Sequence, residues 1–168
     1  MIKNILITGG AGYIGSHISE ILVKNKKKIF IIDNLSTGHR ALINKKAKFY
    51  KLDINKTNKI KNLITRNKID SVIHLAAALS VGESQKKPKK YNKINVIGTK
   101  RLLQALKKTN VKNFIFSSTC AVYKDGLSKV SENSILNPTS VYGKSKLKGE
   151  KLIKSFSKKN LINFGILR

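Results

Sequence analysis

Residues Thr8–Ser16 read TGGAGYIGS and lie between an apolar run, Ile5–Ile7, and a helical pattern that begins near Tyr13. The spacing is G-x-x-G-x-x-G, formed by Gly9, Gly12 and Gly15. Glycine permits a tight turn and a close approach of the backbone to phosphate. A helix that starts here would aim its free N–H groups and positive dipole end at an anion. The stretch therefore predicts a strand–loop–helix unit that binds pyrophosphate, although an ordinary strand-to-helix turn can also be rich in glycine.

The next apolar run, Lys28–Asp33, ends in an acid 18 residues after Gly15. In a dinucleotide-binding fold, a carboxylate at this place binds the hydroxyls of the adenosine ribose. Asp33 would repel a 2′-phosphate, which favours NAD over NADP, although His39 and Arg40 lie near enough in sequence to weaken that preference. The alternative interpretation of Asp33 is a solvated carboxylate at the end of a strand.

Short apolar runs alternate with longer helical patterns along the chain. The expected strands are Asn4–Thr8, Lys28–Asp33, Lys48–Asp53, Ser71–Ala76, Asn113–Ser117 and Asn163–Leu167, and the expected helices are Tyr13–Lys24, Thr57–Asn67, Pro88–Thr109 and Ser140–Lys158. A polar segment, Asp125–Thr139, is expected to form a surface loop before the last helix. Strands rich in Ile, Val and Phe that alternate with helices indicate βαβ units and a parallel sheet with both faces covered.

Right-handed crossovers would make this sheet doubly wound. A chain of 168 residues can bury one good core, so one domain is the expected number. We therefore predict the α/β class, with one Rossmann-like, NAD-binding domain over residues 1–168.

The formal net charge is +27, which invites a nucleic-acid interpretation. Only four of the 35 basic residues are arginine, the better reader of phosphate and guanine. Lysine is abundant together with Asn and Ile, as an AT-rich genome would produce, and the lysines scatter over expected helix faces and loops. We therefore expect no specific nucleic-acid partner, although the positive field should attract anionic nucleotides.

No apolar stretch approaches the roughly 20 residues that a membrane span needs, so no membrane partner is expected. The N-terminal MIKNILITGG runs into the first expected strand without a signal peptide. Cys120 is the only cysteine, which excludes an intrachain disulfide and fits a reducing compartment. The sequence therefore predicts a cytoplasmic location, and no metal site is expected.

Tyr142 and Lys146 are four residues apart in the motif YGKSK and would share one face of the last expected helix. A phenol becomes a useful base when a neighbouring positive charge favours its ionised form. The alternative is an amphipathic helix with an exposed Tyr and Lys, since Tyr91 and Tyr123 also have lysines nearby. The place of Tyr142 after the fifth expected strand, with the glycine loop upstream, favours a catalytic pair.

A hydroxyl cluster, Ser117–Thr119, follows the strand expected at Asn113–Ser117. Open α/β sheets bind ligands at the carboxyl ends of their strands. A hydroxyl there can hydrogen-bond the substrate alcohol, and we assign this role to Thr119, with Ser117 and Ser118 in support. The alternative is a polar cluster that caps the next turn.

These features together resemble the extended short-chain dehydrogenase/reductase family and, within it, the nucleotide-sugar epimerases. The motifs that carry the resemblance are TGGAGYIGSH (Thr8–His17), DNLSTG (Asp33–Gly38), LDI (Leu52–Ile54), HLAA (His74–Ala77), VGES (Val81–Ser84), NVIGT (Asn95–Thr99), VKNFIFSST (Val111–Thr119) and YGKSK (Tyr142–Lys146). They span essentially the whole chain.

The resemblance implies a tightly bound NAD and the interconversion of UDP-glucose and UDP-galactose. Tyr142 would take the proton of the sugar 4-hydroxyl while C4 gives hydride to the nicotinamide, Thr119 would hold the 4-oxygen, and Lys146 would also hold the nicotinamide ribose. The 4-keto sugar would then turn over and take the hydride back on its other face. The implied cofactor contacts are Gly9, Gly12, Tyr13, Ile14, Gly15, Asp33, Asn34, Gly38, Asp53, Ile54, Ala76, Ala77, Asn95, Tyr142 and Lys146.

Three departures from the family pattern matter. Leu79 stands where these epimerases often carry a lysine near the cofactor, and Lys124 replaces a usual glycine. The sequence stops at Arg168, where the family continues into a substrate domain, so that domain is expected to be missing and the activity of this length is in doubt.

Related dehydratases carry an Asp-Glu pair that serves as acid and base for the loss of water. Cys120 and Ala121 stand at those positions here, which disfavours dehydration.

Three alternatives stay open at this point: an NAD-binding module without turnover, another NAD-dependent nucleotide-sugar epimerase, and a basic nucleic-acid-binding protein. The resemblance also implies a homodimer when the protein is full length, because the helices expected at Pro88–Thr109 and Ser140–Lys158 pair in dimers of the family.

Overall fold

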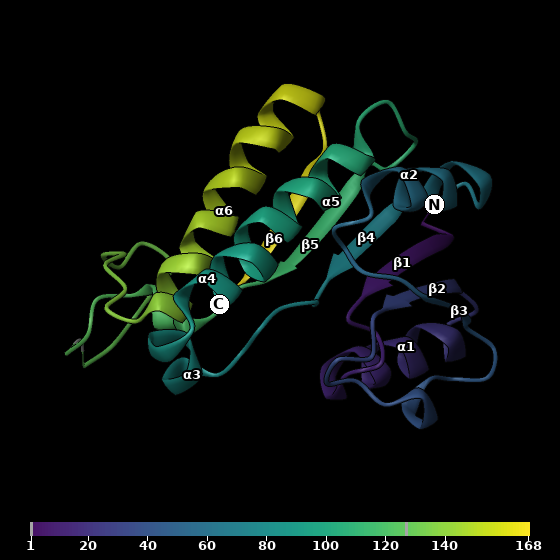
Figure 1. Ribbon diagram of the computed structural model, residues 1–168. Helices are drawn as coiled ribbons and strands as arrows, with labels where there is room; N and C mark the ends of the chain where they lie inside the picture. The colour runs from purple at the N-terminus through teal and green to yellow at the C-terminus, as the bar shows by residue number, and fades with distance from the viewer. Residues whose placement is uncertain (1, 127) are drawn as a thin grey trace.

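The computed structural model describes residues 2–126 and 128–168, and a six-stranded parallel sheet forms its frame (Figure 1). The strands are β1 (Asn4–Thr8), β2 (Lys28–Asp33), β3 (Lys48–Lys51), β4 (Ser71–His74), β5 (Asn113–Ser117) and β6 (Asn163–Leu167). Their order is β3-β2-β1-β4-β5-β6, so the strand order reverses between β1 and β4. At such a reversal the loops at the carboxyl ends part and leave a crevice for a ligand. Leu127, within the loop expected at Asp125–Thr139, lies outside the described residues.

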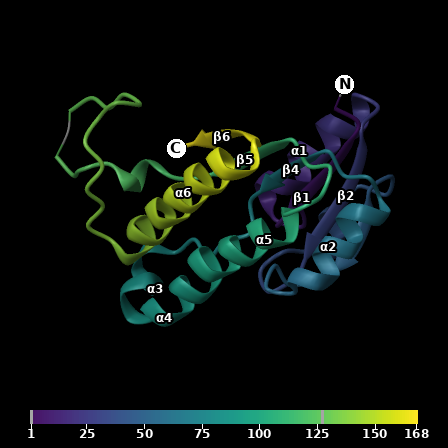
Figure 2. The same cartoon turned by 90° about the horizontal axis from the view of Figure 1, so that it is seen from above.

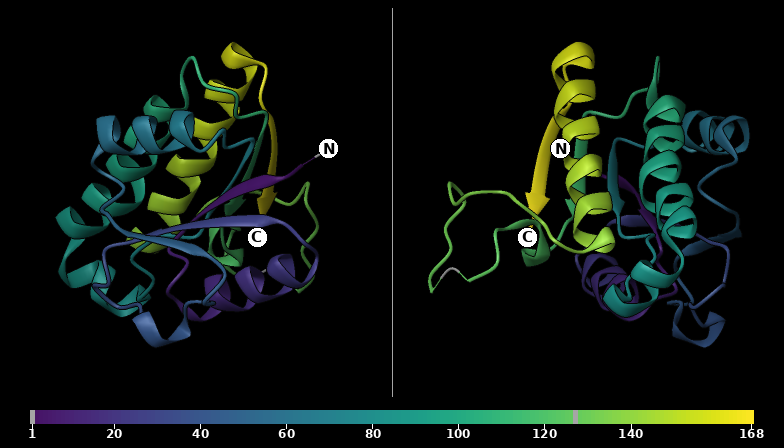
Figure 3. Two further views of the ribbon diagram at one scale, coloured as in Figure 1. Left: turned by 90° about the vertical axis from the view of Figure 1, so that its right-hand side faces the viewer. Right: turned by 60° about the vertical axis from the view of Figure 1, so that its left-hand side comes forward.

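Helices pack against both faces of this sheet, as Figure 3 shows. They are α1 (Tyr13–Lys24), α2 (Thr57–Arg66), α3 (Val81–Lys86), α4 (Pro88–Tyr91), the π-helix η2 (Asn92–Gly98), α5 (Thr99–Leu106) and α6 (Val141–Asn160), with short 3₁₀ turns at η1 (Arg40–Leu42) and η3 (Cys120–Val122). The α/β class and the Rossmann-like, doubly wound sheet predicted from the sequence are thus confirmed. No helix in the described part of the chain is long and apolar enough to cross a membrane.

Two apolar clusters lie on opposite faces of the sheet. One is centred on Ile5, Ile7 and the inward side of α1. The larger one joins Leu6, Val72 and Phe114 to α2, α5 and α6, which lie side by side on the other face (Figures 2 and 3). Alternate residues of β1 therefore serve different clusters, as the two-residue period of a strand requires.

The α1 face is covered less completely than the sequence pattern predicted. Over β5 and β6, Ile115 is 39% exposed and Leu167 is 61% exposed on this side. The reason is that α1 covers the half of the sheet around β1 and β2, whereas α2, α5 and α6 all lie on the opposite face.

Two strands end two residues earlier than predicted because side chains replace the backbone ladder. After His74, the amide of Leu75 still donates to the carbonyl of Thr8 at 3.0 Å, but the amide of Ala76 donates to the Thr8 hydroxyl. After Lys51, the carboxylate of Asp53 accepts the amide of Asn55 at 2.8 Å and turns the chain toward α2. Both corrections lie at the carboxyl edge of the sheet.

The helix expected at Pro88–Thr109 is divided into α4, η2 and α5 and ends at Leu106. Beyond it, the Thr109 hydroxyl donates to the Leu106 carbonyl at 2.7 Å, and Lys108 takes a left-handed conformation. A π-helical segment is rare and occurs often at functional sites, and this one carries Asn95. Apolar periodicity does not distinguish a π-helical turn from an α-helical one, so this segment could not be predicted from the sequence.

Helix α3 was missed, although its start follows a known pattern. Ser80 accepts the amide of Glu83 at 3.1 Å as the N-cap, and the sequence Ser-Val-Gly-Glu fits a capping box. At the other end of the chain, α6 runs to Asn160, two residues beyond the predicted limit, and ends at Leu161 in a left-handed conformation.

Candidate active site

The glycine loop follows β1 and packs against the ends of β2 and β4. Gly9 has a φ of +72°, and a Cβ atom there would lie 2.6 Å from the amide nitrogen of Ala76. A Cβ on Gly15 would lie 2.5 Å from the Gly9 carbonyl oxygen. Both glycines are therefore required by the folding of the loop itself.

Gly12 differs from these two glycines. A Cβ on it would meet only the Gly9 carbonyl oxygen, at an ordinary 3.4 Å. It is the N-cap of α1 and makes no side-chain cap, so the first amides of the helix, at Tyr13 and Ile14, point outward without a capping group. Both side chains are exposed, at 77% and 56%. The open side of the loop can therefore accept an anion at the start of α1.

Asp33 connects the glycine loop to the end of β2. One carboxylate oxygen accepts the amide of Ala11 at 3.1 Å, and the other accepts the amide of Leu35 at 2.8 Å. Each oxygen keeps a second lone pair for a ligand hydroxyl. Gly38 packs on the same loop, since a Cβ on it would lie 2.9 Å from Cβ of Ala11.

Asp53 faces the same edge from the end of β3. Its carboxylate accepts the side-chain amide of Asn34 at 3.0 Å and two hydrogen bonds from Asn55. Burial works to raise the pKa of Asp53, but these hydrogen bonds outweigh it and lower the pKa. The side chain of Ile54 lies in the core at 7% exposure, so only its backbone is available to a ligand.

Ala76 and Ala77 lie half-buried in the extended segment after β4. Asn95, which was expected near the nicotinamide, is only 2% exposed. Its side-chain amide bonds both the N–H and the carbonyl of Ala78, at 2.8 and 3.0 Å, and the hydroxyl of Ser145 at 2.9 Å. Its polar atoms thus all have partners inside the protein.

Tyr142 and Lys146 lie in the first two turns of α6 and are both buried, at 8% and 3% exposure. The alternative of an exposed amphipathic pair is therefore wrong. The ring of Tyr91 stands edge-on to Tyr142 at 6.4 Å between centroids, and the Lys146 ammonium lies 4.4 Å from the centre of the Phe116 ring. The Tyr–Lys face of the helix thus packs against α4 through Tyr142 and against the end of β5 through Lys146.

Gly143 explains how α6 comes close to the hydroxyl cluster after β5. A Cβ on Gly143 would collide with the carbonyl oxygen of Ala121, so only glycine lets this turn of α6 touch the segment after Thr119. The Thr119 oxygen accepts the amide of Ala121 at 3.2 Å, and its hydroxyl hydrogen is left for another acceptor. The capping interpretation and the catalytic interpretation of Thr119 are therefore compatible.

Burial shifts the pKa of the Lys146 ammonium. It lowers the pKa of this ammonium to about 8, while the nearby Glu150 carboxylate works in the opposite direction. A lysine with a pKa near neutrality can gain or lose its proton under ordinary conditions, and such groups gather at functional sites.

Several residues of this region carried no predicted role. Glu150 is completely buried, and both its oxygens bond the Arg168 guanidinium, at 3.1 and 2.7 Å, while Oε1 also accepts the Ser118 hydroxyl. Ser84 accepts the amide of Tyr142 at 3.1 Å. In the sequence, only the four-residue spacing of Lys146 and Glu150 could have indicated that Glu150 lies on the same helix face as the Tyr–Lys pair.

Comparisons with known proteins agree with this geometry. The profile of the NAD dependent epimerase/dehydratase family matches residues 5–168. The chain is 43% identical to the UDP-glucose 4-epimerase of Lactobacillus helveticus, over 98% of this chain and 50% of that protein. It is 40% identical to a putative UDP-glucose 4-epimerase of Methanocaldococcus jannaschii, over 98% of this chain and 54% of that protein.

Solved structures show the same relation. A UDP-glucose 4-epimerase of Brucella ovis in complex with NAD superposes with a TM-score of 0.94 at 35% identity, over 99% of this chain and 51% of that one. The enzyme of Thermotoga maritima with UDP-glucose gives a TM-score of 0.92 at 36% identity, over 98% of this chain and 54% of that one. The chain thus spans about half the length of the relatives that it matches.

Replacement of the buried ammonium should stabilise the fold. Because the pKa of Lys146 falls from 10.5 to about 8 on folding, its charging costs stability below pH 10.5, and the cost is complete below pH 8. We expect Lys146→Met to raise the free energy of unfolding at pH 7 by about 1–3 kcal/mol, and to lose this gain at pH 10.5. Urea unfolding at both pH values measures it, with the exposed Lys144→Met as the matched control. A Lys146→Met protein that is less stable than the parent at pH 7 would contradict this account.

Proposed function

The chain belongs to the NAD dependent epimerase/dehydratase family, and from this premise we propose that it is the NAD-binding half of a nucleotide-sugar 4-epimerase that acts on UDP-hexoses. One observation carries the proposal: the buried Tyr142–Lys146 pair lies on the helix that packs against the end of β5, at the same carboxyl edge as the glycine loop. The relatives named UDP-glucose 4-epimerase support the substrate class.

The residues at the edge of the sheet fit NAD. The pyrophosphate would lie on the open side of Gly12, against the outward amides of Tyr13 and Ile14. Asp33 would use its remaining lone pairs for the adenosine ribose. The other contacts that we propose are Gly9, Gly15, Asn34, Gly38, Asp53, Ile54, Ala76, Ala77, Asn95, Tyr142 and Lys146. NAD, when bound, supplies a hydride acceptor and donor for the sugar C4.

The chain's own residues would manage the proton. Tyr142 would take it from the sugar 4-hydroxyl and return it, and the Lys146 ammonium would stabilise the ionised phenol. Thr119 would donate its free hydroxyl hydrogen to the sugar oxygen that becomes a carbonyl. Burial of Tyr142 and Lys146 excludes water from this exchange, so their charges interact more strongly than in solvent.

Two alternatives remain within the family. A chain that binds NAD without turnover would have the same glycine loop and Asp33. A different UDP-sugar is the second alternative, because one solved relative is a UDP-Glc/GlcNAc 4-epimerase from Campylobacter jejuni, at 39% identity.

We propose a cytoplasmic location, which the single cysteine, Cys120, supports.

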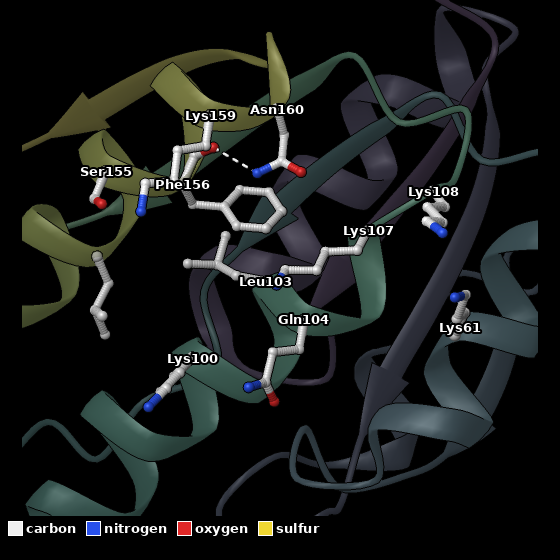
Figure 4. Close-up of a pocket in the computed structure, with 11 residues that line it drawn as sticks. Lys61, Lys100, Leu103, Gln104, Lys107, Lys108, Ser155, Phe156, Lys159 and Asn160 are labelled. Atoms are coloured by element: carbon white, nitrogen blue, oxygen red, sulfur yellow. Dashed lines mark hydrogen bonds between the residues drawn. The ribbon is translucent and has the colours of Figure 1, made fainter.

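We also propose a homodimer that pairs the α5 and α6 face, on which a groove of about 770 Å³ runs between the helices (Figure 4). Its floor is apolar at Leu103 and Phe156, and its rim carries the amines of Lys61, Lys100, Lys107, Lys108 and Lys159. None of the lining residues is acidic, so two copies that meet here would bring like charges together.

Asp33 should determine the cofactor preference. Asp33→Asn removes the charge that would repel a 2′-phosphate and keeps one acceptor oxygen, enough for one of the two amides, Ala11 or Leu35, that the carboxylate now accepts. We expect NAD binding to weaken by about 1–3 kcal/mol, the scale of a hydrogen bond to a charged group, and the preference over NADP to shrink. Calorimetry with both cofactors measures this, with Asp125→Asn on the surface loop as the control. An unchanged ratio of the two affinities would remove Asp33 from the role.

Turnover should depend on Tyr142. The test joins this chain to the remaining half of the Lactobacillus helveticus relative, which supplies the part of that protein that the chain does not match. We expect Tyr142→Phe to keep bound NAD but to lower kcat for UDP-galactose about 10²–10⁴-fold, because general acid–base groups contribute on this scale. A loss below tenfold would exclude Tyr142 as the base. The 168-residue chain alone, assayed in parallel, should show little conversion, because it matches only 50% of that relative and the other half would help to orient the sugar.

Self-association should strengthen as salt rises. Screening of the lysines around the groove reduces their mutual repulsion, while the apolar floor keeps its affinity. Sedimentation at low and high salt measures the dimer fraction, and Lys107→Glu should raise that fraction at low salt. Lys46→Glu makes the same change of charge away from the groove and serves as the control. Dimerisation that weakens with salt, or that responds equally to both variants, would place the interface elsewhere.

A further inference from the structure

A buried line of hydrogen bonds joins the end of β1 to the start of α6. Thr8 Oγ1 lies 2.6 Å from His74 Nδ1, and His74 Nε2 lies 2.9 Å from Thr99 Oγ1. The Thr99 hydroxyl donates to the carbonyl of Asn95 at 2.7 Å. From there the Asn95 side chain donates to Ser145 Oγ at 2.9 Å. All five residues are buried, and we call them the buried relay: Thr8, His74, Thr99, Asn95 and Ser145.

The relay has one consistent direction of donation. Thr99 gives its hydrogen to the Asn95 carbonyl, so its oxygen must accept from His74, which fixes the proton on Nε2. His74 Nδ1 is then an acceptor, and the Thr8 hydroxyl must donate to it. The Thr8 oxygen in turn accepts the amide of Ala76 at 3.3 Å. Each group therefore has a partner only if His74 is neutral and carries its proton on Nε2.

The surroundings of His74 also oppose a charged imidazole. Its ring packs against the rings of Phe114 and Phe116 on β5, at 6.0 and 5.6 Å between centroids. Burial, together with the nearby Lys146 charge, lowers the pKa of His74 to about 3. The relay can thus keep one arrangement of protons throughout the physiological pH range.

The relay holds two parts of the proposed site that would lie near the nicotinamide. Thr8 binds the amide of Ala76, and Asn95 binds both backbone groups of Ala78, so the intervening Ala77 is fixed from both sides. At the far end, Ser145 donates to the carbonyl of Tyr142 at 2.7 Å. The hydrogen bonds of Asp33 and Asp53, which would serve the adenosine end, involve no residue of the relay.

We propose that the buried relay, with His74 as its neutral Nε2–H centre, is a positioning device that sets the Ala76–Ala78 segment and the Tyr142 turn in register with the glycine loop. The proposal rests on the proposed NAD site and deepens it. His74, Thr99 and Ser145 act through other residues, so they are positioning residues. A fully satisfied polar network specifies one arrangement, whereas an apolar core of the same volume would fill the space without fixing these backbone groups.

The test compares NAD with ADP-ribose, which has the same adenosine and pyrophosphate but no nicotinamide. Thr99→Val removes the acceptor of the His74 proton and the donor to Asn95, with little change in volume. We expect its dissociation constant for NAD to rise about tenfold, the equivalent of one unsatisfied buried donor, with ADP-ribose affinity unchanged within about twofold. Thr99→Ser keeps the hydroxyl and should restore NAD affinity. Ser157→Ala is the control, because Ser157 Oγ on α6 is buried without a hydrogen-bond partner.

Nitrogen NMR of the histidine rings reports on the relay without a ligand. His74 should show the Nε2–H tautomer in the parent chain and in Thr99→Ser, and an altered Nε2 environment in Thr99→Val. The amides of Ala76 and Ala78 should exchange with solvent faster in Thr99→Val. His17 and His39, both exposed, supply internal reference signals.

The outcomes separate the relay from the NAD site on which it rests. Equal weakening of NAD and ADP-ribose, or none of either, would mean that the relay is only structural and would overturn its positioning role. If the parent chain binds neither ligand, the proposed NAD site is wrong. The positioning role of the relay is then tested by the histidine NMR spectra and the amide exchange alone. Faster exchange at Ala76 and Ala78 in Thr99→Val would support the relay, and unchanged exchange with an Nδ1–H tautomer of His74 would overturn it.

Discussion

The close approach at Gly9 is the constraint on which the candidate site depends. The left-handed backbone of this residue lets the chain leave β1 and lie against the amide of Ala76, where any side chain would collide. The same turn brings Ala11 to the carboxylate of Asp33 and the Gly9 carbonyl to Gly15 in α1. Three strands and one helix thus meet around a few atoms, and that meeting forms the start of α1, where we propose that an anion binds.

A second constraint is the buried charge on α6. Among the described residues, Lys146 and Glu150 are the lysine and carboxylate side chains that are almost fully buried, on one face of this helix. Glu150 is paired with Arg168 and Ser118, whereas Lys146 lies over an aromatic ring and its pKa is lowered. A buried pair is weak evidence for stability. The arrangement instead fits a site that keeps one ammonium away from water on a helix face that also carries the buried Tyr142.

The charge of the protein therefore has two separate parts. Most of the 31 lysines are exposed, and they produce the positive field that would draw anionic nucleotides toward the molecule. The proposed site relies instead on a few polar groups: the outward amides at the start of α1, the half-buried Asp33 at the end of β2, and the buried relay through His74. A large net charge thus says little about which ligand would be recognised, because that would depend on those few groups.

The sequence by itself determined the parallel sheet, because the apolar runs and glycine spacing are local signals, and it singled out Asp33, Thr119, Tyr142 and Lys146 by motif. It could not determine the π-helix, because apolar periodicity does not distinguish a π-helical turn from an α-helical one. Nor could it determine the partners of His74, which lie 66 and 25 positions away and meet it only when the sheet forms. The burial of the Tyr–Lys pair likewise depends on the packing of α6 against other elements. Tertiary structure alone decided that Asn95 turns inward to Ala78 and Ser145, because a buried amide must find its hydrogen-bond partners within the protein.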